Sequence, residues 1–181
     1  ALPYIKGRSP SADHVAQAGP LLSSWCTDAD PIPLGTLPAW QALDNTDPIF
    51  QSLPQDLSSL MIHPVLMHGD FAPWNLRVSA NGTWNAFDWE RGQFPGVPGW
   101  DWFHYVVQTS ILVRKEAAPQ TMQRLESLIG SNAFQAYTAA TGIQSHPRPL
   151  LIAYLLHARS LRQTEGAHQI DDLLQLVASK P

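Results

Sequence analysis

The sequence predicts a single α+β domain over residues 1–181 that is mainly helical and contains one small β-hairpin. Apolar residues recur at three- and four-residue spacing through most of residues 100–179, which is typical of packed helices. Two short apolar runs, 76–78 and 84–87, flank an Asn-Gly pair, which favours a hairpin with a two-residue turn of positive φ. A chain of 181 residues suits one domain with a sizeable core or one lobe of a larger protein.

The first third of the chain is expected to be rich in loops, because the 16 prolines cluster in residues 1–73 and 95–98. A helix is predicted over 11–25, with Pro20 splitting it. Packed loop follows, with a helical turn at 38–43 and a short helix at 54–61 that leads into a strand at 65–67.

The last 80 residues are expected to form helices, each beginning or ending at a recognisable capping signal. The predicted helices run over 100–115, 120–129, 132–140, a long segment after Pro147, and 168–179. Before them, residues 91–99 contain two prolines and three glycines, so no regular structure is predicted there. That segment is expected to be a substrate-contacting or gating loop, or a plain connector.

Three polar residues lie around the predicted hairpin. Asp70 and Asn75 are five positions apart on one loop, and the hairpin returns Asp88 to the end where Asn75 lies. Carboxylate and amide oxygens are ligands that Mg²⁺ prefers, and a further carboxylate is the group that orients an acceptor hydroxyl in phosphoryl transfer. The spacing therefore predicts Asn75 and Asp88 as metal ligands and Asp70 as the residue facing the acceptor.

His68-Gly69-Asp70, Asn75 and Asp88-Trp89-Glu90 together resemble the catalytic and metal-binding loops of the protein-kinase-like fold. The His-Gly-Asp and Asp-Trp-Glu versions are similar to those of the aminoglycoside phosphotransferase and choline kinase family. Asp101 matches a further acidic position that this family carries at the start of the next helix. The resemblance covers residues 67–107.

The resemblance implies a kinase-like C-terminal large lobe and an ATP- and Mg²⁺-dependent phosphotransferase. The acceptor would be a hydroxyl of a small molecule: an aminoglycoside, a choline-like amine or a sugar. Asp70 would be the catalytic residue, with His68 orienting its loop. Asn75 and Asp88 would hold the metal, and Asp101 would brace the loop. Glu90 and Arg91 are candidates for supporting or substrate contacts.

Residues 1–10 resemble the hinge at which that family's chain enters its large lobe. If so, the nucleotide-covering lobe is supplied by upstream sequence or by another chain. No Gly-x-Gly-x-x-Gly loop occurs in the sequence, so this lobe alone is expected to be a weak or inactive enzyme.

Aromatic residues surround the predicted site, and two roles are open for them. Trp74 and Trp100 are candidates for a cage that binds a quaternary ammonium group, whereas Phe87 and Trp89 are expected to pack in the core. Three histidines fit no zinc motif by spacing and are expected to be core or surface residues: His63, His104 and His157.

Three alternatives stay open. The chain is a pseudokinase that binds ligand without catalysis, a metal-dependent phosphohydrolase built on Asp70, Asp88 and nearby histidines, or a fragment that docks its missing lobe through apolar residues 2–5.

Composition bears on the class of protein and on its cellular compartment. A formal net charge of −4 gives no basic nucleic-acid footprint. The single cysteine, Cys26, excludes an internal disulfide and fits a reducing cytoplasm. No leader peptide and no apolar run near 18 residues is seen, so neither secretion nor a membrane span is expected.

Overall fold

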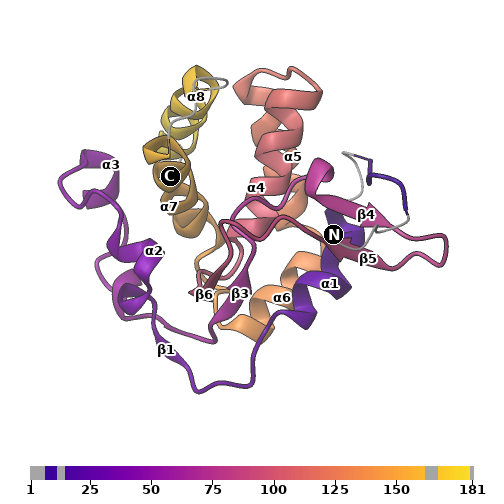
Figure 1. The fold of residues 1–181 in the computed structure, drawn as a ribbon. Helices are drawn as coiled ribbons and strands as arrows, with labels where there is room; N and C mark the ends of the chain where they lie inside the picture. The colour runs from indigo at the N-terminus through magenta and orange to yellow at the C-terminus, as the bar shows by residue number, and fades with distance from the viewer. Residues whose placement is uncertain (1–6, 12–14, 162–166, 180–181) are drawn as a thin grey trace.

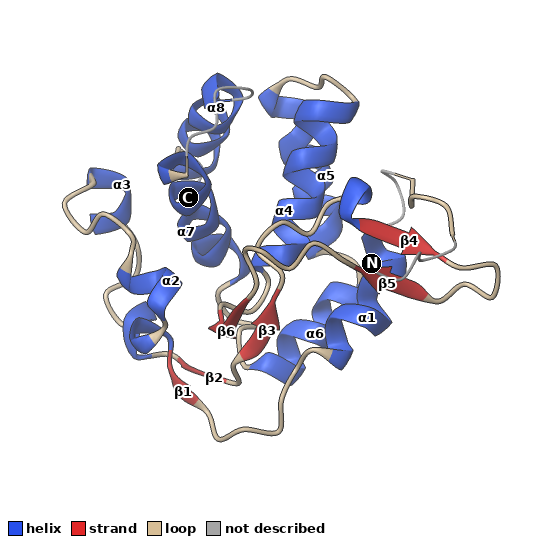
Figure 2. Ribbon diagram, viewed as in Figure 1, coloured by secondary structure: helices blue, strands red, loops and turns tan. Residues whose placement is uncertain are grey.

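The structure is a computed structural model that describes residues 7–11, 15–161 and 167–179 (Figure 1). It is an α+β fold that is mainly helical, as the sequence predicts. Within the described ranges the strands form three separate two-stranded antiparallel sheets (Figure 2). The small sheets hold loops in place, and the helices supply most of the core.

The helices of the second half agree with the predicted ones to within a few residues. Several begin at a proline in the first turn, where the missing N–H costs nothing, and Ser131 caps α6 by accepting a hydrogen bond from the Phe134 N–H at 3.3 Å. In chain order the helices are α1 Gly19–Ser24, α2 Pro38–Gln41, α3 Pro48–Gln51, α4 Trp100–Gln108, α5 Ala118–Ile129, α6 Asn132–Thr141, α7 Pro147–Ser160 and α8 Ala167–Ala178.

The predicted helix 100–115 does not stay α-helical to its end. After α4, residues Thr109–Val113 form a π-helical turn in which the Arg114 N–H reaches back five residues to the Thr109 oxygen at 3.0 Å. The Thr109 hydroxyl donates to the Tyr105 oxygen at 2.7 Å, which helps to widen the turn.

The three sheets are short. β1 Ile32–Pro33 pairs with β2 Met61–Ile62, β3 Val65–Met67 pairs with β6 Gln93–Gly96, and β4 Leu76–Val78 pairs with β5 Trp84–Ala86. The β4–β5 pairing is the predicted hairpin, with Leu76 opposite Ala86 and Val78 opposite Trp84. In Figure 1 the hairpin lies on the side of the molecule opposite α2 and α3.

Two details of this region were predicted wrongly. The hairpin turn is longer than two residues: the Gly82 N–H bonds to the Ser79 oxygen at 2.9 Å, and Gly82 has positive φ while Asn81 does not. The segment 91–99 is also not wholly irregular, because β6 lies within it. Pro95 is tolerated there because β6 belongs to a two-stranded sheet, in which the other side of each strand carries no partner strand.

The first third holds less helix than predicted. Val15–Ala18 is a 3₁₀ turn, α1 begins only at Gly19 with Pro20 in its first turn, and residues 12–14 lie outside the described part. The helix predicted at 54–61 is reduced to a 3₁₀ turn at Leu57–Ser59 followed by β2.

An ion pair ties this region to the helical body. Asp47 caps α3 by accepting from the Ile49 N–H at 2.7 Å, and its other oxygen pairs with Arg159 of α7. The sequence showed neither α3 nor this pair, whose partners are 112 positions apart.

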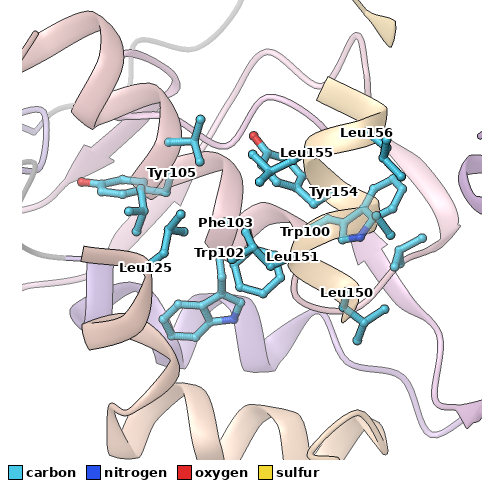
Figure 3. Packing of buried hydrophobic residues seen from close by; sticks show 14 of the residues in the cluster. Trp100, Trp102, Phe103, Tyr105, Leu125, Leu150, Leu151, Tyr154, Leu155 and Leu156 are labelled. Carbon is cyan, nitrogen blue, oxygen red and sulfur yellow. The ribbon is translucent and has the colours of Figure 1, made fainter. Parts of the chain in front are cut away.

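The core is organised around α4, whose residues 100–107 are all buried. Trp102 packs edge-on against Phe134 of α6. Trp100 packs against Tyr154 of α7 (Figure 3). α8 in turn packs against α7 and α5. The helix that carries Asp101 is therefore held on several sides.

The hinge-like segment is described only from Gly7 onward. Arg8 bridges to Val78 through two backbone hydrogen bonds of 3.1 and 2.8 Å, so this segment extends the hairpin at its β4 edge. The apolar residues 2–5, which were considered as a docking surface, lie outside the described residues. In the described part of the chain, no helix has the length and apolar character needed to cross a membrane.

Candidate functional site

The loop that joins β3 to the hairpin is fixed by Asp101. Both oxygens of this buried carboxylate accept backbone hydrogen bonds, from the His68 N–H at 2.7 Å and the Gly69 N–H at 3.0 Å. Burial raises the pKa of the Asp101 carboxyl, while the two N–H donors and the neighbouring histidines oppose that rise. Asp101 therefore braces the loop from the first turn of α4.

Gly69 allows the loop to turn close to the neighbouring chain. Its φ is +77°, and a Cβ atom at this position would lie 2.5 Å from the backbone oxygen of Arg91. The β3–β6 pairing brings residue 91 here, since Met67 lies opposite Gln93. A glycine is therefore needed both for its backbone conformation and for space.

His68 is fully buried and makes two hydrogen bonds from its ring. Nδ1 accepts from the Asp70 N–H at 3.3 Å, and Nε2 lies 2.9 Å from the Phe87 oxygen, to which it donates in the matching tautomer. Trp25 and Trp89 pack on the ring, with centroids 6.3 and 4.6 Å away. This geometry suits a residue that orients the loop and makes no contact with substrate.

Asp70 is held at both carboxylate oxygens. His104 Nε2 lies 3.0 Å from Oδ1, and Asn75 Nδ2 donates to Oδ2 at 3.0 Å. The hydrogen bond with His104 is the main cause that lowers the pKa of Asp70, with partial burial opposing it and Arg91 assisting. Asp70 is therefore an ionised hydrogen-bond acceptor near neutral pH.

The hairpin brings Asn75 and Asp88 to one end, as predicted. The backbone N–H of Phe87 donates to the backbone oxygen of Asn75 at 3.1 Å, just beyond the Leu76–Ala86 pair. Asp88 is the next residue after Phe87 in the chain. Asp88 has φ of +66°, a conformation that non-glycine residues adopt rarely and that aspartate adopts more often than most. Its exposed carboxylate makes no hydrogen bond among the described residues.

A cavity of about 250 Å³ opens beside Asp70. Its polar lining includes Asp70, Arg91 and His104, and Trp74 and Trp100 contribute aromatic surface. The remaining lining consists of Met67, Gly69, Asp101, Gln108, Leu112, Tyr154, His157, Ala158, Leu161 and Ile170. The volume falls just below the range of ~300–1,000 Å³ that is usual for small-molecule sites.

The residues predicted as supporting or substrate contacts differ in whether they line the cavity. Arg91 lines the cavity, whereas Glu90 is exposed and the structure does not bring it to the cavity. Trp74 is 38% exposed, while Trp100 is 1% exposed and stacks near His157. The two tryptophans proposed as a cage therefore share one cavity, but Trp100 is also part of the core.

The expectation that Phe87 and Trp89 pack in the core was wrong, because neither belongs to the buried core and Phe87 is only half-buried. Trp89 is 37% exposed, because it follows the strand and covers the outer side of His68. Arg77 donates to the Leu76 oxygen at 2.7 Å and lies over the Phe87 ring, so it stabilises the hairpin.

Sequence reasoning missed three residues of this site. His104 contacts Asp70, Tyr154 contacts His104, and His157 lines the same cavity. His104 and His157 were expected to be ordinary core or surface residues. The spacing of Asp101 and His104, three positions apart on one helix, was a usable signal because such residues share a face. Tyr154 lies 50 positions away and gave none.

The donor set at the hairpin end fits a magnesium ion completed by phosphate oxygens. The side-chain nitrogen of Asn75 donates to Asp70, which leaves the side-chain oxygen of Asn75 available to bind a metal. The Asp88 carboxylate has no hydrogen-bond partner among the described residues. Mg²⁺ in nucleotide sites uses one or two protein ligands, phosphates and water. Among the described residues, no group of three or more His, Cys, Asp or Glu is placed to hold a metal ion. That finding does not test a site with a single carboxylate.

Comparisons of the chain with protein families, with curated proteins and with solved structures found no significant match.

Proposed function

We propose that this chain is the large lobe of a small-molecule phosphotransferase with a kinase-like fold. In this proposal Asp70 accepts a hydrogen bond from the acceptor hydroxyl and aligns it for attack on the terminal phosphate of ATP. The observation that carries the proposal is that Asp70 lies between the cavity and Asn75, on the same loop.

Magnesium belongs to the proposal through Asn75 and Asp88, which would hold it. When bound, the ion offsets negative charge that develops on the phosphates. The chain's own residues orient the groups: Asp101 and His68 fix the loop, and Asn75 fixes one oxygen of Asp70. We further propose that the part covering the nucleotide comes from upstream sequence or from another chain.

The cavity favours an acceptor with one hydroxyl at Asp70 and a flat or apolar body against Trp74 and Trp100. Choline-like amines suit such aromatic surfaces by cation–π attraction, worth ~0.5–2 kcal/mol per contact. Sugars and aminoglycosides stay within the proposed class, because acceptor choice depends on the side chains of variable loops.

The first test measures magnesium-dependent ATP binding by isothermal titration of the wild-type chain, the Asp88→Ala variant and an Asp56→Ala control. Asp56 is exposed and its side chain makes no capping hydrogen bond, so its removal leaves the site intact. We expect binding that requires Mg²⁺, that Asp88→Ala abolishes and that Asp56→Ala keeps. Equal binding by Asp88→Ala would contradict the metal assignment.

A second readout covers weak binding. With Mn²⁺–ATP in place of the magnesium complex, paramagnetic broadening should be greatest at the amide signals of residues 75 and 88. With the part that covers the nucleotide supplied, transfer of labelled phosphate to an aminoglycoside, choline or hexose should disappear in Asp70→Asn. Nucleotide binding without transfer under those conditions would favour the pseudokinase alternative, and phosphate release without acceptor would favour the phosphohydrolase.

A further inference from the structure

Behind Asp70 lies a row of polar side chains that the proposed function does not use. His104 and Gln108 are four positions apart on α4, so they share a face. Tyr154 of α7 packs against them. Tyr154 is 2% exposed and His104 9% exposed, so each polar atom here needs a partner inside the protein.

The hydrogen bonds of this row have a defined direction. Asp70, with its lowered pKa, is ionised and only accepts, so His104 Nε2 carries the proton of the 3.0 Å bond. In the neutral ring Nδ1 is then an acceptor, and the Tyr154 hydroxyl, 3.1 Å away, donates to it. Burial raises the pKa of Tyr154, so its hydroxyl keeps its proton and acts as the donor.

Both ring nitrogens of His104 are therefore occupied by protein groups. His104 has no free nitrogen with which to take a proton from an acceptor, although its ring lines the cavity. Its effect must pass through Asp70. A carboxylate has about four acceptor positions; His104 takes one on Oδ1 and Asn75 one on Oδ2, which fixes the plane of the group and leaves positions for a ligand hydroxyl.

We propose that Tyr154 and His104 form a directional hydrogen-bond chain that holds the Asp70 carboxylate in one orientation, with His104 as a positioning residue for the acceptor hydroxyl. The role at the acceptor rests on the proposed phosphotransfer, whereas the chain of hydrogen bonds does not. The chain of hydrogen bonds predicts that neutral His104 adopts only the tautomer protonated at Nε2, although a neutral histidine has two tautomers available.

Other charged and titratable groups face this row and must be accounted for. Asp101 lies one turn earlier on α4 and attracts a protonated His104. His157 of α7 repels it, and burial lowers the pKa of His157 to about 4, so that ring is neutral above that region. Arg91 faces Asp70 from the segment before β6. None of these groups is hydrogen-bonded to His104, so His104 variants change the contact with Asp70 while keeping the surrounding charges.

The experiment uses nuclear magnetic resonance on the 181-residue protein in the absence of ATP and acceptor. Long-range proton–nitrogen spectra at pH 7 should show His104 protonated at Nε2 and bare at Nδ1. The χ1 rotamer of Asp70 is then measured at the same pH from its three-bond couplings in wild type, His104→Leu and His104→Gln, with His63→Gln as a control. His63 bonds to the Ala29 oxygen and does not line the cavity.

We expect Asp70 to hold one χ1 rotamer in wild type and to average over rotamers in His104→Leu. His104→Gln should restore most of the single rotamer, because its amide donates from nearly the same place. The Asp70 couplings of His63→Gln should equal those of wild type. An Nδ1-protonated or exchanging ring, or equal Asp70 couplings in all variants, would overturn the proposal. A fixed Nε2 tautomer in a chain that transfers no phosphate would leave this inference standing while the proposed function fails.

Discussion

Gly69 shows how a single residue can be required by geometry alone. Its positive φ lets the loop turn between β3 and Asp70, and the backbone of Arg91 occupies the space where a side chain would begin. Gly82, in the hairpin turn, has a similar φ of +84° but meets no atom within 4 Å. The two glycines therefore separate the cost of conformation from the cost of crowding.

We expect Gly69→Ala to destabilise the protein more than Gly82→Ala. An alanine at positive φ costs about 1–2 kcal/mol at either position, and at residue 69 the backbone must also shift away from the Arg91 oxygen, which adds about 1–3 kcal/mol. Urea unfolding followed by circular dichroism measures both. Equal midpoints for the two variants would show that the loop at residue 69 yields without cost.

Asp88 shares the positive φ of Gly69, and it follows the hairpin where Gly69 precedes it. An aspartate there keeps a backbone conformation that glycine would adopt more easily, and its carboxylate is exposed without a partner among the described residues. Residues that hold such conformations cluster at functional sites, where the surrounding structure maintains them. The backbone bonds that Phe87 makes to Asn75 and to the His68 ring provide that support.

At the scale of elements, the site depends on how α4 is joined to the loop before the hairpin. Asp101 stands in the first turn of α4, where a carboxylate would interact favourably with the helix dipole. Its oxygens nevertheless accept from the loop, and the helix has no side-chain cap. The helix therefore positions the loop, and the loop positions Asp70.

Two roles of Asp101, as a hydrogen-bond acceptor for the loop and as a charge at the helix dipole, predict different results for Asp101→Asn. Loss of a favourable dipole contact costs ~0.3–1 kcal/mol. Loss of one carboxylate oxygen leaves a buried N–H of His68 or Gly69 without an acceptor, which costs about 1–3 kcal/mol. We expect the larger loss of unfolding free energy, together with changed chemical shifts at residues 68–70. A loss under 1 kcal/mol with unchanged loop shifts would favour a dipole role.

Elements that depend on local sequence were predictable, and those that depend on distant pairing were not. The β4–β5 hairpin and α5, α6 and α8 follow from periodicity and nearby turn or capping residues. β6 was missed because its local sequence, Phe94-Pro95-Gly96, argues against a strand. It forms because β3 offers a partner and because Gly96 leaves room beside Met67, whose Cβ would lie 2.3 Å from an added one.

The residues of the candidate site also differ in whether local sequence or distant packing brings them there. Asp70, Asn75 and Asp88 were found from spacing, since a loop and a hairpin bring them together. His104 needed the three-residue step from Asp101, and Tyr154 needed the packing of α7 on α4. Neighbours supplied by tertiary packing carry no pattern in a single sequence, although one of them, His104, is the main cause that lowers the pKa of Asp70.

For the whole molecule, the cavity and the core are parts of one packed body. Trp100 lines the cavity and also stacks near His157, so a change at the cavity wall is felt in the packing of α4 on α7. His157 is a titratable group within this packing. Burial lowers its pKa to about 4, and the nearby His104 adds to the effect.

Stability should therefore depend on pH through His157. In the unfolded chain the ring takes up a proton near its ordinary pKa of about 6.5, while the folded protein resists until about pH 4. The unfolded state binds more protons between these values, so the stabilising contribution is complete above pH 6.5 and is lost progressively as pH falls to about 4. In His157→Gln this part of the dependence disappears.

The measurement is the free energy of unfolding from urea titrations of wild type and His157→Gln at intervals from pH 8 to pH 4. Subtracting one series from the other removes the carboxylates that the two proteins share. We expect a constant difference above pH 6.5, set by packing against Trp100, and a difference that shifts in favour of the variant below it. A difference independent of pH would mean that the folded protein protonates His157 as readily as the unfolded chain, and that the wall of the cavity is more open to water than the packing of α4 and α7 implies.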